Sequence, residues 1–135
     1  MSARLGLKVV TRNGAVEAGP APHLTAFCPR YHQAVELIGK RWTGAILRLL
    51  FTGPHRFNEI LAGVPGLSDR LLSERLRELE AATLVVRHVF PGPPIRSEYE
   101  LTTRGGELEP VVREISAWAE RWIELPPQVA EASGV

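Results

Sequence analysis

The chain has 135 residues and a mass of 14.9 kDa, which suits one globular domain. Apolar residues make up 44% and charged residues 23%, as in ordinary soluble proteins, so a wholly disordered chain is not expected. No apolar run approaches the roughly 18 residues of a membrane-spanning helix, and we expect no signal peptide. The single cysteine, Cys28, excludes an internal disulfide and points to a reducing, cytoplasmic compartment.

Charge is distributed unevenly along the chain. Residues 28–96 carry ten basic and six acidic side chains, whereas residues 97–135 carry three basic and eight acidic ones. Residues 1–27 carry three basic and one acidic. This asymmetry favours a central region that faces a polyanion and a C-terminal region that stays clear of it.

Both ends differ in composition from the middle of the chain. Residues 1–27 form an arm in which two short apolar stretches flank Asn13-Gly14, a pair typical of a tight hairpin turn. A linker rich in Pro and Ala follows. Residues 126–135 are again rich in small residues and predict a flexible tail. The main domain is therefore expected over residues 28–125.

Three helices are predicted in the first half of this domain. The first begins at Pro29 and is interrupted by Gly39, and a second apolar stripe runs from Trp42 until Gly53-Pro54 ends it. A short third helix is expected over residues 56–62, followed by a tight connection over residues 63–67.

The next helix is expected over residues 68–82. Ser68 is a good N-cap, and Leu72, Leu76 and Leu79 fall on one stripe. The opposite face carries Arg70, Glu74 and Arg77, with Ser73 at its edge.

A hairpin and a long helix complete the domain. The β-branched run over residues 84–90 predicts a strand, the prolines over residues 91–94 predict a loop, and residues 95–101 predict the return strand. A final helix should start after Thr102 or Thr103 and reach about Leu125, with a kink or break near Glu109 because Pro110 lies inside it. Its wide apolar stripe includes two tryptophans.

This order of elements is typical of a helix-turn-helix followed by a wing. The fold class is therefore mainly α with a small β-hairpin wing. In such domains the second helix of the pair enters the major groove of DNA, where an arginine fork can bond guanine. Arg87 and Arg96 in the wing would then reach phosphates.

A series of short motifs runs along this domain in a fixed order. The motifs are Cys28-Pro29, IGKRWT (38–43), RFNEI (56–60), PGLS (65–68), LSERLRELE (72–80), Pro93-Pro94, EYELT (98–102), LEP (108–110) and Trp118. Together they resemble the HxlR-type winged helix-turn-helix transcription regulators of bacteria and archaea, and the resemblance covers about 95 of the 135 residues.

The resemblance implies a prokaryotic, homodimeric regulator of transcription that binds a palindromic or pseudo-palindromic operator. Its recognition helix would span residues 68–82, its wing about 90–96, and its first and last helices would form the dimer. The expected DNA-binding residues are Ser68, Asp69, Arg70, Ser73, Glu74, Arg77, Arg56, Arg87 and Arg96. The expected dimer contacts are Tyr31, Val35, Ile115, Trp118 and Trp122.

The chain departs from the family pattern at three places. Arg41 stands where Lys usually precedes the tryptophan. Thr83 stands where a glycine usually follows the recognition helix, so this turn must avoid or tolerate a left-handed conformation. The wing carries Ile95-Arg96-Ser97 before Glu98, which is about one residue more than usual.

Cys28 has two interpretations. At a helix start, with Arg30 and His32 nearby, its thiolate is favoured, so it could sense an oxidant or a small-molecule electrophile. As the only thiol it would form an intersubunit disulfide, a mixed disulfide or an adduct. The alternative is a small buried residue.

Other functions find little support. Trp118 and Trp122 could stack single-stranded bases, but core or dimer contacts suit them better because Glu120 and Glu124 lie nearby. The four histidines lack metal-ligand spacing, and Glu98 and Glu100 lack a cleft for acid–base chemistry. We expect no enzyme, metal, cofactor or membrane partner. The alternative to a DNA-binding regulator is a winged-helix module for protein–protein assembly.

Overall fold

The computed structural model describes residues 9–10, 16–17 and 26–127 of the chain, which divides into two units, residues 1–36 and 37–135. In the first unit, strands β1 (Val9–Val10) and β2 (Val16–Glu17) pair in antiparallel fashion. The predicted turn at Asn13-Gly14 and the tail after residue 127 lie outside the described residues. Helix α1 (Pro29–Ile38) begins at the proline and ends before Gly39, as its sequence predicts.

Helices α2 (Thr43–Leu50), α3 (Phe57–Gly63) and α4 (Asp69–Ala81) form the core of the second unit. Between α3 and α4, Gly66 adopts a φ of +90°, a backbone conformation that side chains disfavour. Ser68 then caps α4, because its hydroxyl accepts a hydrogen bond from the backbone N–H of Leu71 at 3.1 Å. These two helices and their turn form the predicted helix-turn-helix.

The sheet has three antiparallel strands in the order β3–β5–β4, namely β3 (His55–Arg56), β4 (Val85–Phe90) and β5 (Arg96–Leu101). Strands β4 and β5 form the predicted hairpin, with Phe90 opposite Arg96 at the end next to the connecting loop. The expectation that Arg56 starts the third helix was wrong. Arg56 belongs to β3, opposite Glu98 of β5, and precedes the first residue of α3.

The turn after α4 adopts the left-handed conformation at Thr83, one of the two outcomes expected for a residue other than glycine at this position. Thr83 has a φ of 59°, in a region that L-residues rarely adopt. Its hydroxyl donates to the carbonyl of Ala82 at 2.6 Å and accepts from Arg104 at 2.8 Å. The Thr102 hydroxyl donates to the carbonyl of Thr83 at 2.7 Å. These hydrogen bonds hold the turn in place.

The C-terminal segment forms two helices, α5 (Thr103–Gly106) and α6 (Glu109–Trp122), so the kink or break expected near Glu109 is a break. Thr102 caps α5, since its hydroxyl accepts from the backbone N–H of Gly105 at 3.1 Å. Pro110 falls in the first turn of α6, where its missing N–H is not needed. The predicted end at Leu125 was wrong, because α6 ends at Trp122.

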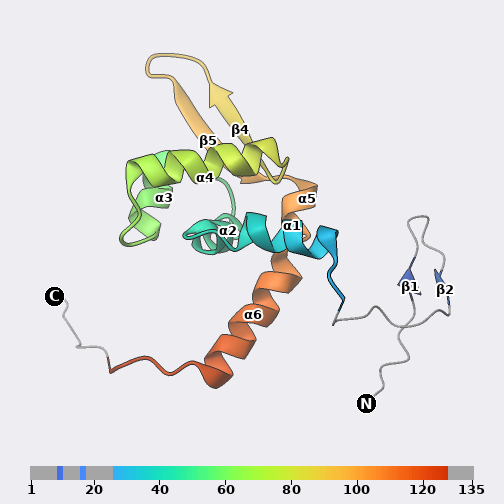
Figure 1. Cartoon of the computed structure of the whole chain (residues 1–135). Coiled ribbons are helices and arrows are strands. Elements are labelled where there is room, and N and C mark those ends of the chain that lie inside the picture. The colour runs from blue at the N-terminus through green and yellow to red at the C-terminus, as the bar shows by residue number, and fades with distance from the viewer. Residues whose placement is uncertain (1–8, 11–15, 18–25, 128–135) are drawn as a thin grey trace. The chain divides into compact units, whose positions relative to one another are not determined.

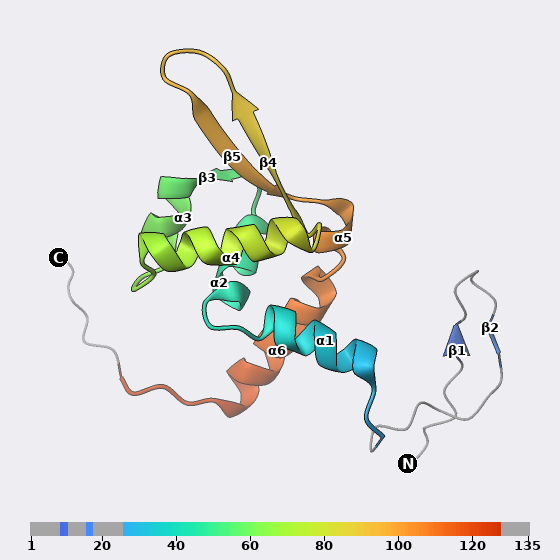
Figure 2. The same ribbon diagram turned by 45° about the horizontal axis from the view of Figure 1, so that its top comes forward.

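Figures 1 and 2 show how the second unit is arranged. Helix α4 lies across the helical core, and the β4–β5 hairpin projects from the core beyond it. Helix α6 leaves the core on the side opposite the hairpin in both views.

In the described part of the chain, no helix is both long enough and apolar enough to cross a membrane. The buried apolar core consists of Ile46, Leu47, Leu50, Ile60, Val64, Leu67, Leu72, Leu76, Leu79, Leu84, Val85 and Tyr99.

Candidate nucleic-acid interface

Helix α4 has one buried face and one open face. Leu72, Leu76 and Leu79 are buried in the core. On the other side, the Arg70 side chain is 78% exposed, and Arg77 is also exposed. The leucine stripe therefore fixes which arginines face solvent, as helical spacing predicts.

Glu74, on this open face, lies close to two arginines. Its carboxylate is 3.4 Å from Arg70 Nη1 and 3.7 Å from Arg75 Nη1. The bond to Arg70 is long and joins two solvent-accessible groups, so it restrains the Arg70 side chain only weakly. Arg70 can therefore exchange this partner for another acceptor.

A groove of about 330 Å³ separates the second half of α4 from the sheet. Arg77 from α4 and Arg87 from β4 both line it, so the fold brings together two arginines that are distant in sequence. The groove is also lined by Ser73, Leu76, Glu80 and Tyr99. Two guanidinium groups facing one groove suit the phosphate backbone of a nucleic acid.

Tyr99 closes this groove on the sheet side. Burial raises the pKa of the Tyr99 phenol above its ordinary value of 10.0, and the positive charge of Arg87 opposes that shift only in part. The phenol therefore keeps its proton at neutral pH and can donate a hydrogen bond.

The remaining predicted DNA-binding residues lie around α4 and at the wing. Ser68 and Asp69 are exposed at the N-terminus of α4. Arg56 is exposed in β3, where its backbone N–H bonds Glu59 at 2.8 Å. Arg96 starts β5 at the wing end, and its guanidinium lies 5.8 Å from the centre of the Phe90 ring. Neither Arg56 nor Arg96 lines the groove between α4 and the sheet.

Sequence reasoning missed the role of Arg75. Its side chain is only 13% exposed, and its Nε donates to the backbone carbonyl of Arg41 at 2.9 Å. Its Nη1 bonds the carboxylate of Glu78 at 3.2 Å, and Lys40 bonds that same carboxylate at 3.0 Å. These contacts tie the turn before α2 to α4. The position of Arg75 could have revealed this role, because Arg75 lies next to the leucine stripe on the helical wheel.

The predicted dimer residues are exposed. In α6, Trp118 is 54% and Trp122 is 66% exposed, and Ile115 is exposed beside them, so this stripe is not part of the core. In α1, Tyr31 and Val35 are exposed. Exposed apolar stripes of this kind mark surfaces that bind another protein.

Cys28 is a free, exposed thiol, so the alternative of a small buried residue was wrong. It directly precedes α1, and its Sγ accepts a hydrogen bond from the backbone N–H of Tyr31 at 3.5 Å. Two residues close to Cys28 in sequence, Phe27 and His32, have ring centres 5.3 Å apart. A thiol at this place is accessible to reagents in solution.

Two histidines pair with carboxylates at the surface. His88 and Glu100 pair at 2.8 Å on the wing, and His55 and Glu59 pair at 3.5 Å. Over residues 26–127 and the two short strands, no group of three or more His, Cys, Asp and Glu side chains could hold a metal ion.

Comparison with known proteins identifies the family. A family profile described as HxlR-like helix-turn-helix matches residues 37–126. The chain is 50% identical over 97 residues to an uncharacterized HTH-type transcriptional regulator, YvaP, of Bacillus subtilis, covering 72% of this chain and 90% of that protein. It is 42% identical over 104 residues to the HTH-type transcriptional regulator YodB of the same organism, covering 77% and 93%.

Solved structures of such regulators share the fold. Reduced YodB from B. subtilis matches with a TM-score of 0.66 and 41% identity, covering 76% of this chain and 100% of the other. The oxidized form of the redox regulator HypR matches with a TM-score of 0.68 and 36% identity, covering 73% and 100%. A third structure shows YodB with quinone bound. The chain therefore belongs to the HxlR-like family of helix-turn-helix transcriptional regulators, which are winged-helix DNA-binding proteins and not enzymes.

Proposed function

We propose that this regulator binds a specific operator as a homodimer, with α4 in the major groove and the wing on the DNA backbone or in the minor groove. The observation that carries the proposal is the open face of α4. It presents Arg70 and Arg77 to solvent on the side away from the leucine stripe. Arginine forks on such a helix bond guanine in the major groove.

The groove between α4 and the sheet supports a phosphate contact at its mouth. A DNA strand that follows α4 would pass Arg87 on the sheet side of the groove, and its charge favours a phosphate there. Arg96, at the wing end, would contact the backbone or the minor groove. Phosphate contacts of this kind set the register of the protein on DNA, and α4 supplies the base contacts.

The exposed stripe of α6 supports the dimer. A homodimer would cover Trp118 and Trp122 and would place two copies of α4 about 34 Å apart, which is one turn of DNA. Because α6 leaves the core opposite the wing, its acidic side chains would point away from phosphate (Figures 1 and 2).

Fluorescence anisotropy with operator duplex at two salt concentrations tests DNA binding. Arg70→Ala or Arg77→Ala should weaken specific binding by about 1–3 kcal/mol where the arginine contacts a base. Arg96→Ala should weaken binding to all sequences and reduce the salt slope by about one. Arg121→Gln on α6 is the matched control and should bind as wild type. Binding without any salt dependence, or three unaffected arginine variants, would favour a protein–protein assembly module.

Cys28 supports a response to oxidants or electrophiles. Its Sγ is exposed and hydrogen-bonded at the start of α1, and relatives have been solved in reduced, diamide-treated and quinone-bound forms. With diamide, two Cys28 thiols from two subunits would lose two electrons and two protons, which reduce diamide to its hydrazine, and form one disulfide. With a quinone, the thiolate would add to a ring carbon and leave a hydroquinone thioether.

DNA affinity and protein mass before and after each reagent test this response. We expect a covalent dimer or an adduct, together with a changed DNA affinity, in wild type and not in Cys28→Ser. Unchanged mass and affinity in wild type would leave Cys28 without a sensing role.

A further inference from the structure

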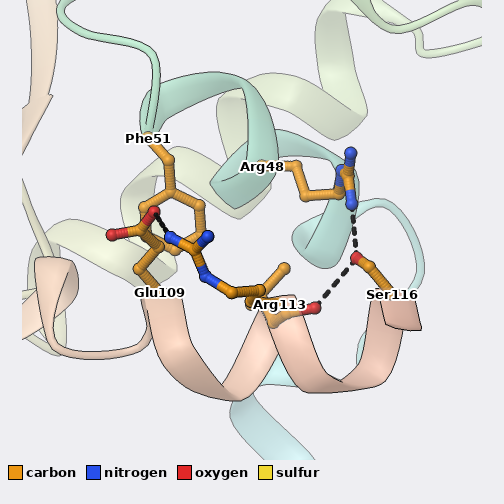
Figure 3. Close-up of a pocket in the computed structure, with 6 residues that line it drawn as sticks. Arg48, Phe51, Glu109, Arg113 and Ser116 are labelled. Carbon is orange, nitrogen blue, oxygen red and sulfur yellow. Dashed lines mark hydrogen bonds and ion pairs between the residues drawn. The ribbon is translucent and has the colours of Figure 1, made fainter. Parts of the chain in front are cut away.

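A cavity of about 210 Å³ opens between α2 and α6, away from the groove beside α4 (Figure 3). Helix α2 belongs to the helical core, whereas α6 buries none of its residues. The cavity therefore lies where the least embedded helix of this unit meets the core. Its lining residues are Arg48, Phe51, Glu109, Val112, Arg113 and Ser116.

Two guanidinium groups reach this cavity from its two sides. Arg48 comes from α2 and donates to the hydroxyl of Ser116 on α6, and that hydroxyl donates to the carbonyl of Val112 at 2.9 Å. Among the described residues, Arg48 has no carboxylate within ion-pair distance, so its charge is not neutralised by a salt bridge. The cavity can therefore accept a negative charge at Arg48.

Arg113 has an acidic partner that it can exchange. Its Nη2 lies 2.6 Å from the carboxylate of Glu109, and both side chains are at least half exposed. Exposed pairs at this helical spacing contribute little stability, because water competes for both groups. An anion that took Arg113 from Glu109 would leave Glu109 hydrated at the surface.

The rest of the lining is apolar. Phe51 and Val112 are half-buried, and Figure 3 shows the Phe51 ring beside the Glu109–Arg113 pair. Pockets for drug-sized ligands measure about 300–1,000 Å³, so this smaller volume suits a compound with a single ring. A flat ring against Phe51 and a carboxylate between the two arginines would match both parts of the lining.

We propose that this cavity binds a small aromatic carboxylate, with Arg48 and Arg113 holding the carboxylate and Phe51 contacting the ring. A bound ligand would change how α6 packs on α2. The effect of the ligand on DNA binding rests on the proposed function. In the proposed homodimer, such a change would alter the distance between the two copies of α4 and therefore the affinity for operator.

Titration calorimetry with benzoate, and with benzamide as the uncharged analogue, tests the site. Wild type should bind benzoate with a Kd in the millimolar range or tighter and should bind benzamide at least tenfold more weakly. Arg48→Ala and Arg113→Ala should each lose at least tenfold in benzoate affinity with an unchanged Tm. Arg121→Gln, an exposed arginine of α6 outside the cavity, should bind as wild type. No binding, equal binding of benzamide, or unaffected arginine variants would overturn the site.

DNA anisotropy with saturating benzoate separates this site from the proposed function. We expect benzoate to change operator affinity in wild type and not in Arg48→Ala. Benzoate binding that depends on Arg48, in a protein that binds no DNA, would support the site and contradict the proposed function. An operator affinity that benzoate does not change would overturn the coupling between the site and DNA binding.

Discussion

Replacing Arg75 with Ala removes the side chain that joins α4 to the turn before α2. The wild-type guanidinium makes a hydrogen bond of 2.9 Å to the carbonyl of Arg41 and another of 3.2 Å to the Glu78 carboxylate. Hydrogen bonds of charged groups contribute about 1.5–3 kcal/mol each when buried. Arg41 is an exposed residue and Glu78 keeps Lys40 as a partner, so the total loss is smaller than twice that range.

We therefore expect Arg75→Ala to lower the free energy of unfolding by about 2 kcal/mol, which corresponds to a fall in Tm of about 8 °C for a domain of this size. Urea unfolding followed by circular dichroism measures this change. All variants must be compared at one protein concentration, because association contributes to the apparent stability.

Two further variants make the result specific. Arg70→Ala should change stability by less than about 0.5 kcal/mol, because Arg70 is exposed and makes only the 3.4 Å bond to Glu74. Arg75→Lys should recover part of the loss, since lysine keeps the charge and lacks the fork that reaches both acceptors. Equal stability of Arg75→Ala and wild type, or an equal loss in Arg70→Ala, would refute the role assigned to Arg75.

Three other predictions concern Gly105, Glu59 and Trp118. Gly105→Ala should lower stability by about 3 kcal/mol, because the added Cβ would overlap the carbonyl oxygen of Leu84, whereas Gly106→Ala, with nothing near its Cβ, should raise stability by about 0.5–1 kcal/mol in thermal unfolding. The backbone N–H of Arg56 holds the pKa of the Glu59 carboxyl below its ordinary value of 4.5, so this charge stabilises the fold above pH 4.5 and less as pH falls through the lowered pKa. The stability difference between wild type and Glu59→Gln should therefore shrink below pH 4.5 in acid titrations of unfolding. Trp118→Ala should shift the protein from dimer to monomer at micromolar concentration in analytical ultracentrifugation, and a wild-type monomer there would exclude the proposed dimer.

Much of the fold could be predicted because strong local signals specify it. The cap at Ser68 and the leucine stripe define α4 within one residue at its C-terminal end, and the prolines over residues 91–94 separate the two wing strands. Strand β3 could not be predicted, because two residues are too few to show an alternating pattern and the pairing with β5 is set by tertiary contacts. Thr102 or Thr103 was predicted to cap the C-terminal segment and Pro110 to kink or break it, but the sequence did not decide between a kink and a break.

The candidate site was predicted only as far as one helix determines it. Spacing along α4 is enough to place Arg70 and Arg77 on the open face. The groove shared by Arg77 and Arg87 depends on how the sheet packs against α4, which spacing along the chain does not reveal. The hydrogen bond from Arg75 to Arg41 likewise joins residues that are separated by 34 positions.

Selection of bound duplexes from a random DNA pool tests most directly whether two copies of α4 read one operator. We expect enrichment of an inverted repeat whose half-sites are centred about 10–10.5 base pairs apart, or a multiple of that spacing. Arg70→Ala and Arg77→Ala should relax the preference at particular positions within each half-site. A pool that stays random, or one that yields a single isolated half-site, would contradict the reading of one operator by two copies of α4.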